Sequence, residues 1–369
     1  MADDSITIVR VDLPGRPYDL EIAAGLLDRI GERLAQFGSF RTATVITDSN
    51  VASLYGQRLG ESLLRAGIEY SLLAIPAGDQ SKSLNITAEL YDELAAIRHD
   101  RAQPIIALGG GVVGDLAGFV AATWHRGVPF VQCPTTLEAM IDAAIGGKTA
   151  INLPAGKNLV GVFHQPMFVC IDIDCLATLS ERDFRAGLAE SVKHAVIDNS
   201  GFCDWQTAHA KAILEHQPSA LLELIRRNCA IKAAVVAADE RELSPQGVGR
   251  AALNFGHTVG HALESASNYS LRHGEAVALG MIAEMELAVR SCGFLDAERQ
   301  SIERLLNHFG VPCTTTFDPD AIVSKLISDK KNRGARIRFV LPRRLGDLVW
   351  IDSLPQSDIL AALGRIQAR

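Results

Sequence analysis

Short apolar runs and longer amphipathic segments alternate along the first half of the chain. The apolar runs are of strand length and rich in β-branched residues, whereas the segments between them have helical spacing. This alternation is typical of a parallel sheet covered by helices. The predicted strands are residues 43–48, 70–76, 104–109, 129–134 and 168–172.

The two ends of this pattern differ from it. Residues 6–23 contain two strand-like runs around a Pro-Gly pair, which predicts an antiparallel hairpin at the edge of the sheet. After about Thr178, apolar residues recur with helical spacing, and a last strand candidate at 336–342 precedes a C-terminal helix. The long helical segments are residues 179–197, 220–240, 273–293 and 297–310.

These patterns predict an α/β domain at residues 1–177 and a mainly α-helical domain at residues 178–369. The chain has 369 residues, of which 48% are hydrophobic, enough for two packed cores. Its net charge of -7 argues against a nucleic-acid or anionic-membrane partner, because either would need a broad basic face.

Targeting and redox signals indicate a cytoplasmic protein. No stretch approaches the ~20 apolar residues of a membrane helix. The N-terminus lacks the basic, apolar and small-residue succession of a secretory signal. The seven cysteines include no C-x-x-C pair, and we expect them to be reduced thiols.

Glycines follow the predicted strand 104–109 and open the next helix. Gly109, Gly111 and Gly114 have the G-x-G-x-x-G spacing, which lets backbone amides at a helix start approach a pyrophosphate. They also fit a tight turn that packs the helix on the sheet, and the acidic residue expected about 20 positions later is missing. Polar or small residues also follow the other strands, at 48–50, 76–83 and 134–142. Since parallel strands bind ligands at their carboxyl ends, we expect a nucleotide site at this edge.

Histidines in the second half are candidates for a metal site. His257 and His261 lie four residues apart on one predicted helix face and have the spacing of a chelating pair. His273 opens the next helix, and Glu190 lies in the first helix of the second domain. Two histidines and a carboxylate would make an open catalytic zinc site. Each histidine alone also fits a helix surface or a satisfied core position.

Basic residues in glycine-rich or apolar contexts indicate a pocket for a polyanion. In an acidic chain, cations such as Lys148 and Lys157, flanked by Gly, Ala and Leu, are not expected to form a solvated face. The candidates are Arg126, Lys148, Lys157, Lys193, Lys232, Arg250 and Lys330.

Motifs along nearly the whole chain resemble those of the 3-dehydroquinate synthase family. They lie, in order, at residues 134–166, 188–197, 238–242, 250–261, 273–280 and 329–331. The resemblance implies an α/β N-terminal Rossmann-like nucleotide-binding domain, a mainly α-helical C-terminal metal-binding domain and a cytoplasmic homodimer.

The resemblance also implies a reaction and its cofactors. The family converts a small-molecule sugar phosphate, 3-deoxy-D-arabino-heptulosonate 7-phosphate, into 3-dehydroquinate and phosphate, the second step towards chorismate and aromatic amino acids. It uses NAD and one divalent metal, zinc or cobalt, for a transient oxidation, phosphate elimination, reduction and aldol closure. The departing phosphate is thought to take the proton itself, so no general base is assigned.

The family pattern assigns residues to three groups. The implied metal ligands are Glu190, His257 and His273, whereas spacing alone favours a His257–His261 pair. The implied substrate-binding residues are Arg126 from the neighbouring subunit, Asp142, Lys148, Asn158, Lys193, Lys232, Arg250, Asn254, His261 and Lys330. The implied NAD-binding residues are Asp48, Asn50, Ala77, Gly78, Asp79, Gln80, Ser81, Lys82, Gly110, Gly111, Val112, Val113, Gly114, Asp115, Thr135, Thr136, Lys148, Lys157, Cys175, Leu176, Ala177, Thr178 and Leu179.

Other functions share much of this pattern. A related sugar phosphate cyclase such as 2-deoxy-scyllo-inosose synthase would use the same metal and NAD on another sugar. Arg250 favours a substrate with a carboxylate, which neutral sugar phosphates lack. A metal-dependent alcohol dehydrogenase would not need so many basic residues, and a non-catalytic NAD- or metal-binding relative would not need all the groups together.

Overall fold

The computed structural model describes residues 6–198, 201–243, 247–267, 270–332, 337–352 and 354–368, without the side chains of residues 328–332. These residues form two compact units. Unit 1 consists of the described residues up to Leu179 together with Leu221–Ala237. Unit 2 consists of Ser180–Ala220 and the described residues from Ala238 onwards. Unit 1 therefore includes Leu221–Ala237, a segment that lies well beyond residue 177, where the first domain was expected to end.

A seven-stranded sheet forms the centre of unit 1, in the order β1-β2-β9-β6-β5-β3-β4. β1 and β2 pair as an antiparallel hairpin and the other pairs are parallel, as the sequence predicts. All five strands predicted for the parallel part are confirmed, each within one residue of its expected ends. The strands are β1 (Thr7–Val11), β2 (Tyr18–Ala23), β3 (Thr42–Asp48), β4 (Glu69–Ile75), β5 (Ile105–Gly109), β6 (Phe130–Pro134) and β9 (Phe168–Asp172).

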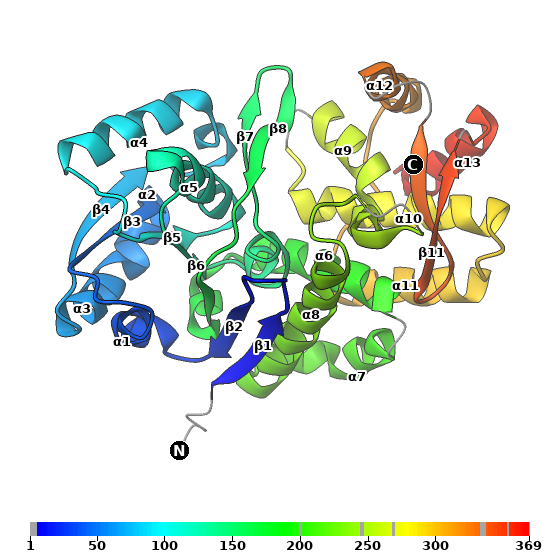
Figure 1. Ribbon diagram of the computed structural model, residues 1–369. Coiled ribbons are helices and arrows are strands. Elements are labelled where there is room, and N and C mark those ends of the chain that lie inside the picture. The colour runs from blue at the N-terminus through cyan, green and yellow to red at the C-terminus, as the bar shows by residue number, and fades with distance from the viewer. Residues whose placement is uncertain are drawn as a thin grey trace. The chain divides into compact units, whose positions relative to one another are not determined.

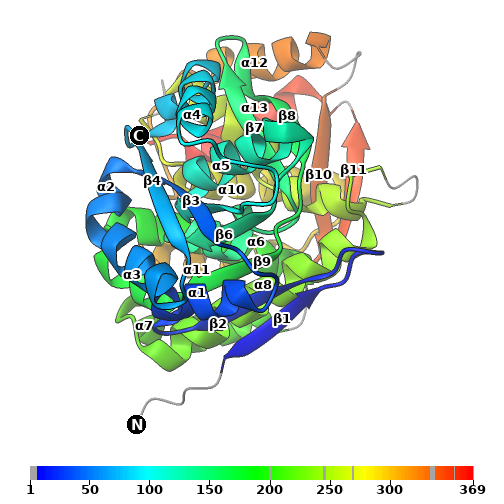
Figure 2. The same cartoon turned by 60° about the vertical axis from the view of Figure 1, so that its left-hand side comes forward.

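Helices cover both faces of this sheet. α4 and α5 lie on one face, and α1 and α3 on the other (Figures 1 and 2). The α4–α5 face is closed by an apolar core that includes Ile46, Leu94, Leu116 and Phe130. The helices are η1 (Leu26–Arg29), α1 (Ile30–Ala35), α2 (Ser49–Val51), η2 (Ala52–Gly56), α3 (Gln57–Arg65), η3 (Asp79–Ser81), α4 (Leu84–Ala96), α5 (Gly111–Thr123), η4 (Trp124–Arg126), η5 (Ala139–Ala143) and η6 (Ile173–Thr178), with most of α8 (Pro218–Ala238).

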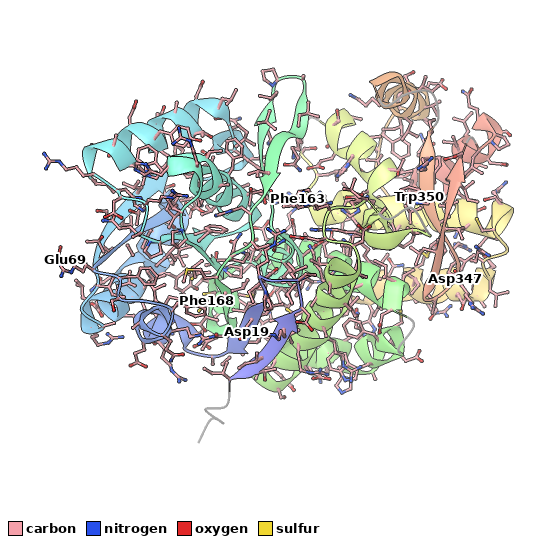
Figure 3. The ribbon with its side chains drawn as sticks, viewed as in Figure 1. Asp19, Glu69, Phe163, Phe168, Asp347 and Trp350 are labelled. Atoms are coloured by element: carbon pink, nitrogen blue, oxygen red, sulfur yellow. The ribbon has the colours of Figure 1, made fainter. Side chains whose placement is uncertain are left out.

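Unit 1 also contains a hairpin that the sequence patterns did not predict. β7 (Lys148–Leu153) and β8 (Gly156–Phe163) pair antiparallel as a separate two-stranded sheet (Figure 1). The side chain of Phe163, which ends β8, is labelled in Figure 3. The hairpin is joined to α5 where Gly118 faces Thr149, since a Cβ on Gly118 would lie 2.4 Å from the Thr149 methyl group.

Unit 2 is mainly helical, as predicted, with α10 at its centre. Every α10 residue from Gly274 to Ala288 except Glu286 is buried, and α6, α9, α11 and α13 all contact this helix. The helices are α6 (Glu181–Asp198), α7 (Phe202–Leu214), the ends of α8, η7 (Gly249–Asn254), α9 (His257–Ala266), α10 (His273–Ser291), α11 (Asp296–His308), α12 (Pro319–Asn332) and α13 (Gln356–Ile366).

A second hairpin precedes the last helix. β10 (Arg338–Arg344) confirms the strand expected near 336–342, and β11 (Asp347–Asp352), which was not predicted, pairs with it antiparallel. Trp350 on β11, labelled in Figure 3, is covered by the Arg338 guanidinium, whose carbon lies 5.0 Å from the ring centroid. Among the described residues, no helix has the length and apolar character needed to cross a bilayer.

Candidate active site

Glycines bring three helices of unit 2 unusually close together. A Cβ on Gly274, at the start of α10, would lie 1.9 Å from the Ala186 carbonyl oxygen on α6. A Cβ on Gly280 would lie 1.9 Å from the Gly256 carbonyl oxygen, and one on Gly260 would lie 3.0 Å from the Ala276 oxygen. Only glycine allows the two 1.9 Å approaches, so the backbone of α10 lies directly against the backbone of α6 and of Gly256, which precedes α9.

A buried carboxylate fixes the start of α9. Glu284 on α10 accepts hydrogen bonds from the backbone amides of Gly256, at 2.7 Å, and Val259, at 3.1 Å. These amides belong to the N-terminal end of α9, where the helix dipole favours an acidic partner. Burial nevertheless raises the pKa of Glu284 to about 8. The contact anchors the helix turn that carries His257.

Three side chains with metal-ligand chemistry converge in this unit. Glu190 comes from α6, His257 from the first position of α9 and His273 from the first position of α10. One ligand atom of each lies within 4.8 Å of the others. Glu190 Oε1 is 3.8 Å from His257 Nε2 and 3.5 Å from His273 Nε2. The convergence brings together the three residues that the family resemblance names as metal ligands.

The buried carboxylate of this group fits a metal ion. Among the described residues, neither oxygen of Glu190 has a hydrogen-bond partner, although Lys193 Nζ forms an ion pair with Oε2 at 2.5 Å. Burial acts to raise the pKa of Glu190, but Lys193, His273 and His257 outweigh it and hold the pKa well below its ordinary value. Glu190 is therefore an anion at neutral pH, and a buried anion is stable only where neighbouring cations or hydrogen-bond donors compensate its charge.

His257 is a neutral imidazole. Burial, followed by the charge of Lys193, lowers its pKa well below the ordinary value. Its Nδ1 lies 3.1 Å from the Phe255 carbonyl oxygen, which can accept only if Nδ1 carries the proton. The lone pair is then on Nε2, the atom nearest Glu190.

His261 belongs to a different group of donors. Its ring lies 5.3 Å from that of His257 and 5.9 Å from that of His273, measured between centroids. A second group of possible ligands contains His261, Glu264 and His273, whereas His257 and His261 share neither group. Among the described residues, no group of three possible ligands therefore contains the His257–His261 pair that the four-residue spacing favours.

Two other expected substrate residues of unit 2, Arg250 and Asn254, lie just before His257 in the sequence. Arg250 in η7 is 2% exposed, and its guanidinium donates to the Glu240 carbonyl oxygen. Asn254 donates to Glu242 at 2.8 Å, a partner that the sequence analysis did not single out. Lys330 lies in α12, and its side chain is outside the described residues.

In unit 1, the glycine-rich turn lies between β5 and α5. Gly110 is the N-cap of α5 and provides no capping side chain, and Gly111 is the first helical residue. The first amides of this 13-residue helix therefore suit an anion such as a pyrophosphate. Gly114 has a packing role instead, because a Cβ there would lie 2.8 Å from Gln132 Oε1. Gly114 thus fits the packing explanation, whereas Gly110 and Gly111 are placed as the anion-binding explanation requires.

Lys82 joins the start of α4 to α5 and the β7–β8 hairpin. Its ammonium lies 2.5 Å from Asp115 Oδ2 and donates to Asn158 Oδ1, also at 2.5 Å. Burial raises the pKa of Asp115, and Lys82 acts in the opposite direction. The structure thus brings together two expected NAD-binding residues and an expected substrate-binding residue.

Asp79 ties the loop after β4 to the same hairpin. Its Oδ2 lies 3.2 Å from Lys157 Nζ and accepts from Asn152 Nδ2 at 3.3 Å. Asn152 in turn accepts from the backbone amide of Asn158 at 3.0 Å, where Asn158 has a left-handed φ of 56°. Asn152 was not among the expected site residues, because nothing in the sequence placed it opposite Asp79.

The buried Lys232 pairs with the half-buried Asp142 within unit 1. Lys232 Nζ donates to the Asp142 carbonyl oxygen at 2.6 Å and forms an ion pair with its carboxylate. Lys232 lies on α8, in the segment assigned to unit 1, although the sequence suggested that it belonged to the helical domain. Lys148, the first residue of β7, is exposed.

The remaining expected NAD-binding residues occupy the strand ends. Asp48 caps α2 and accepts from the amides of Asn50 and Val51 at 2.9 and 3.1 Å. Thr178 lies 2.6 Å from the Tyr55 hydroxyl, which also donates to the Cys175 carbonyl. The other members lie at the following places: Ala77, Gly78, Gln80 and Ser81 around η3; Val112 and Val113 in the first turn of α5; Thr135 and Thr136 after β6; Leu176, Ala177 and Leu179 at the end of η6.

Arg126 has a strained backbone. It is exposed, and φ is 48° at His125, 65° at Arg126 and 114° at Gly127, three successive residues in the left-handed region. Such conformations cost on the order of 1–3 kcal/mol at each non-glycine residue and cluster at functional sites.

The fold is shared with enzymes whose structures contain NAD and a metal. A 2-epi-5-epi-valiolone synthase from Streptomyces hygroscopicus subsp. jinggangensis, with NAD+ and Zn2+ bound, superposes with a TM-score of 0.86 at 31% identity, covering 95% of this chain and 96% of that one. A 2-deoxy-scyllo-inosose synthase, complexed with carbaglucose-6-phosphate, NAD+ and Co2+, gives 0.86 at 26% identity, covering 97% and 99%. An iron-containing alcohol dehydrogenase, at 14% identity and a TM-score of 0.66, shares the fold alone.

Sequence comparison identifies the family to which the chain belongs. The family models "3-dehydroquinate synthase N-terminal" and "3-dehydroquinate synthase C-terminal" match residues 72–186 and 187–332. The 3-dehydroquinate synthase of Desulforamulus reducens is 44% identical over 97% of this chain and 99% of its own. That of Caulobacter vibrioides is 42% identical over 93% and 94%. The chain belongs to the 3-dehydroquinate synthase family.

Proposed function

We propose that the chain converts 3-deoxy-D-arabino-heptulosonate 7-phosphate into 3-dehydroquinate and phosphate. The observation that carries this function is the convergence of Glu190, His257 and His273 in a chain that is 44% identical to a 3-dehydroquinate synthase over nearly its whole length. Relatives at 41–44% identity are named 3-dehydroquinate synthase, whereas the two cyclases with other names are 26–31% identical to this chain.

Glu190, His257 and His273 would hold one zinc or cobalt ion. Their chemistry fits, because a buried anionic carboxylate and a neutral imidazole are ligands that both metals accept. When bound, the metal supplies a Lewis acid that lowers the pKa of a substrate alcohol, and NAD supplies a transient hydride acceptor. Lys193 forms an ion pair with Glu190 and is one of several groups that lower the pKa of its carboxyl.

The N-terminal end of α5 would bind the NAD pyrophosphate. Gly110 and Gly111 leave the first amides of the helix accessible to an anion. Asp48, Asp79 and Thr178, at the carboxyl ends of β3, β4 and β9, supply acceptors and hydroxyls for the ribose groups. The β7–β8 hairpin would be positioned for NAD by the Lys82–Asn158 and Lys157–Asp79 contacts.

The substrate has a phosphate and a carboxylate, and the chain has matching cations. Lys193 and Lys232 are buried and are held in place by Glu190 and Asp142, so their side chains are largely ordered in advance. Arg250 suits the carboxylate, which separates this function from that of a cyclase acting on an uncharged sugar ring. Lys148, Asn158, Asn254, His261 and Lys330 complete the proposed substrate-binding set.

The proposed function includes a cytoplasmic homodimer in the pathway to chorismate. All seven cysteines are free, which suits a reducing compartment. The strained backbone at His125–Gly127 supports the proposal that Arg126 binds substrate in the neighbouring subunit. The segment exposes Arg126 at a cost in backbone energy, and such strain clusters at functional sites. Light scattering of the purified protein tests the dimer.

The deciding experiment measures phosphate release from the heptulosonate phosphate with NAD present. We expect turnover that a chelator abolishes and zinc or cobalt restores, and that glucose 6-phosphate does not replace the substrate. His273→Ala should be inactive with an unchanged circular dichroism spectrum. Undiminished phosphate release by His273→Ala would refute the metal assignment, and turnover of glucose 6-phosphate alone would favour a different cyclase.

A further inference from the structure

His273 lies between two carboxylates, one at each ring nitrogen. Its Nε2 is 3.5 Å from Glu190 Oε1, and its Nδ1 is 3.5 Å from Glu264 Oε2. Glu264 lies on α9 and is 5% exposed. The Glu264 carboxylate is therefore placed to act on the imidazole from the side opposite Glu190.

A neutral imidazole has one N–H group and one lone pair. A carboxylate next to Nδ1 favours the tautomer with the proton on Nδ1, because a carboxylate can only accept. The lone pair is then on Nε2, which faces Glu190. His257 has the same arrangement, with the Phe255 carbonyl 3.1 Å from Nδ1 and with Nε2 towards Glu190.

We propose that Glu264 is a positioning residue that fixes the tautomer and ring orientation of His273 for metal binding through Nε2. This inference rests on the proposed metal site of Glu190, His257 and His273. A carboxylate that accepts from the distal nitrogen of a ligating histidine increases the basicity of that histidine. Loss of such a carboxylate weakens metal binding by about 10–100-fold. The family motifs did not identify this role, since Glu264 lies just beyond residues 250–261.

Glu264 also belongs to the second donor group, with His261 and His273. A second ion there would need the Nδ1 lone pair of His273, while the first ion needs the Nε2 lone pair. A neutral imidazole cannot supply both. The geometry therefore favours one metal ion per chain, with Glu264 as hydrogen-bond acceptor.

The test measures metal affinity without substrate or turnover. Zinc and cobalt affinities are obtained by competition with a chromophoric chelator, together with the visible spectrum of the cobalt form and the unfolding midpoint of the metal-free protein. We expect Glu264→Ala to weaken binding on the order of 10–100-fold and to change the cobalt spectrum. Glu264→Gln, whose amide oxygen can still accept from Nδ1, should retain most of the affinity. Glu286→Ala is the control for metal affinity, because Glu286 pairs with Arg290, Arg299 and Arg365 and is in neither donor group.

Three results would count against the inference, and they are distinguishable. Wild-type affinity in Glu264→Ala, with His273→Ala defective, would overturn the positioning role alone. If the wild-type chain binds two ions and Glu264→Ala binds one, Glu264 is a ligand of a second metal site. Unchanged affinity in His273→Ala would refute the proposed metal site and the inference with it. Because metal-free unfolding is measured for each variant, a general loss of folding is recognised separately.

Discussion

Gly280 on α10 approaches Gly256, just before α9, so closely that a methyl group on Gly280 would lie 1.9 Å from the Gly256 carbonyl oxygen. The obstacle is backbone, which cannot rotate away as the end of a side chain can. Since His257 follows Gly256 directly, the contact also sets the position of a proposed metal ligand.

Gly280→Ala should therefore destabilise unit 2 and weaken metal binding together. Overpacking of this kind costs about 1–3 kcal/mol, or more where backbone must move. Denaturant unfolding and zinc competition measure the two effects. Gly364→Ala on α13 is the matched control, because nothing lies within 4 Å of its added Cβ, and it should be neutral or stabilising by up to ~1 kcal/mol. Equal unfolding free energies and zinc affinities for Gly280→Ala and Gly364→Ala would contradict the close contact.

Lys193→Met should lower the stability of the metal-free protein and raise its metal affinity. The Lys193 ammonium is 1% exposed and forms an ion pair with Glu190, so breaking the pair costs about 3–5 kcal/mol. The same ammonium competes with a dication for the carboxylate, and two unit charges 4 Å apart repel by ~4 kcal/mol at an effective dielectric constant of 20. We expect at least about tenfold tighter zinc binding at pH 8, or 1.4 kcal/mol.

Chelator competition and denaturant unfolding check this pair of effects. Lys211→Met is the control, because Lys211 on α7 has an 85% exposed side chain and should change neither quantity. Weaker zinc binding by Lys193→Met would mean that Lys193 helps to organise the ligands rather than competing for one of them.

Glu284→Gln should remove part of the pH dependence of stability. Burial raises the pKa of Glu284 from 4.5 to about 8, so between these values the folded state binds more protons than the unfolded state. The contribution of Glu284 to the free energy of unfolding is complete below pH 4.5 and is lost as pH rises through 8. The free energy of unfolding falls by at most about 1.4 kcal/mol per pH unit in this window. Glutamine cannot ionise. Denaturant unfolding of the metal-free proteins from pH 6 to 9 should show a shallower decline for the variant, and parallel curves would contradict the raised pKa.

Lys82→Met should destabilise unit 1 by about 3–5 kcal/mol, because it leaves the Asp115 carboxylate without its buried ammonium partner. The double variant with Asp115→Asn should recover part of this loss, since no buried charge is then left unpaired. Denaturant unfolding of the four proteins of the cycle measures the coupling. Additive losses would show that the 2.5 Å contact contributes nothing specific.

The central strands β3, β5, β6 and β9 were predictable because each is a mostly buried, largely apolar run, which few other structures accommodate. The β7–β8 hairpin was not, because every residue of β8 is exposed or half-buried and the strand has no buried apolar run that would mark it. The sequence placed α8 in the helical domain, and periodicity alone could not show which core its apolar face joins. Most of that helix belongs to unit 1.

The limits of spacing are clearest among the histidines. A four-residue interval puts His257 and His261 on one helix face, but it cannot show which third residue approaches from another helix. The ligand group of Glu190, His257 and His273 depends on the glycines that let α6, α9 and α10 meet. Glu264 and Glu284, which act through these helices, have no signal in the sequence beyond being acidic residues in apolar surroundings.

The assignment of Leu221–Ala237 to unit 1 has a consequence for synthesis on the ribosome. Unit 1 lacks its last segment, including Lys232, until the ribosome has translated well past Ala237. By then the two helices α6 and α7 of the other unit have already emerged. Unit 1 therefore cannot finish folding until α6 and α7 have been synthesised, and a gene truncated after Leu179 would encode an incomplete core rather than an independent nucleotide-binding module.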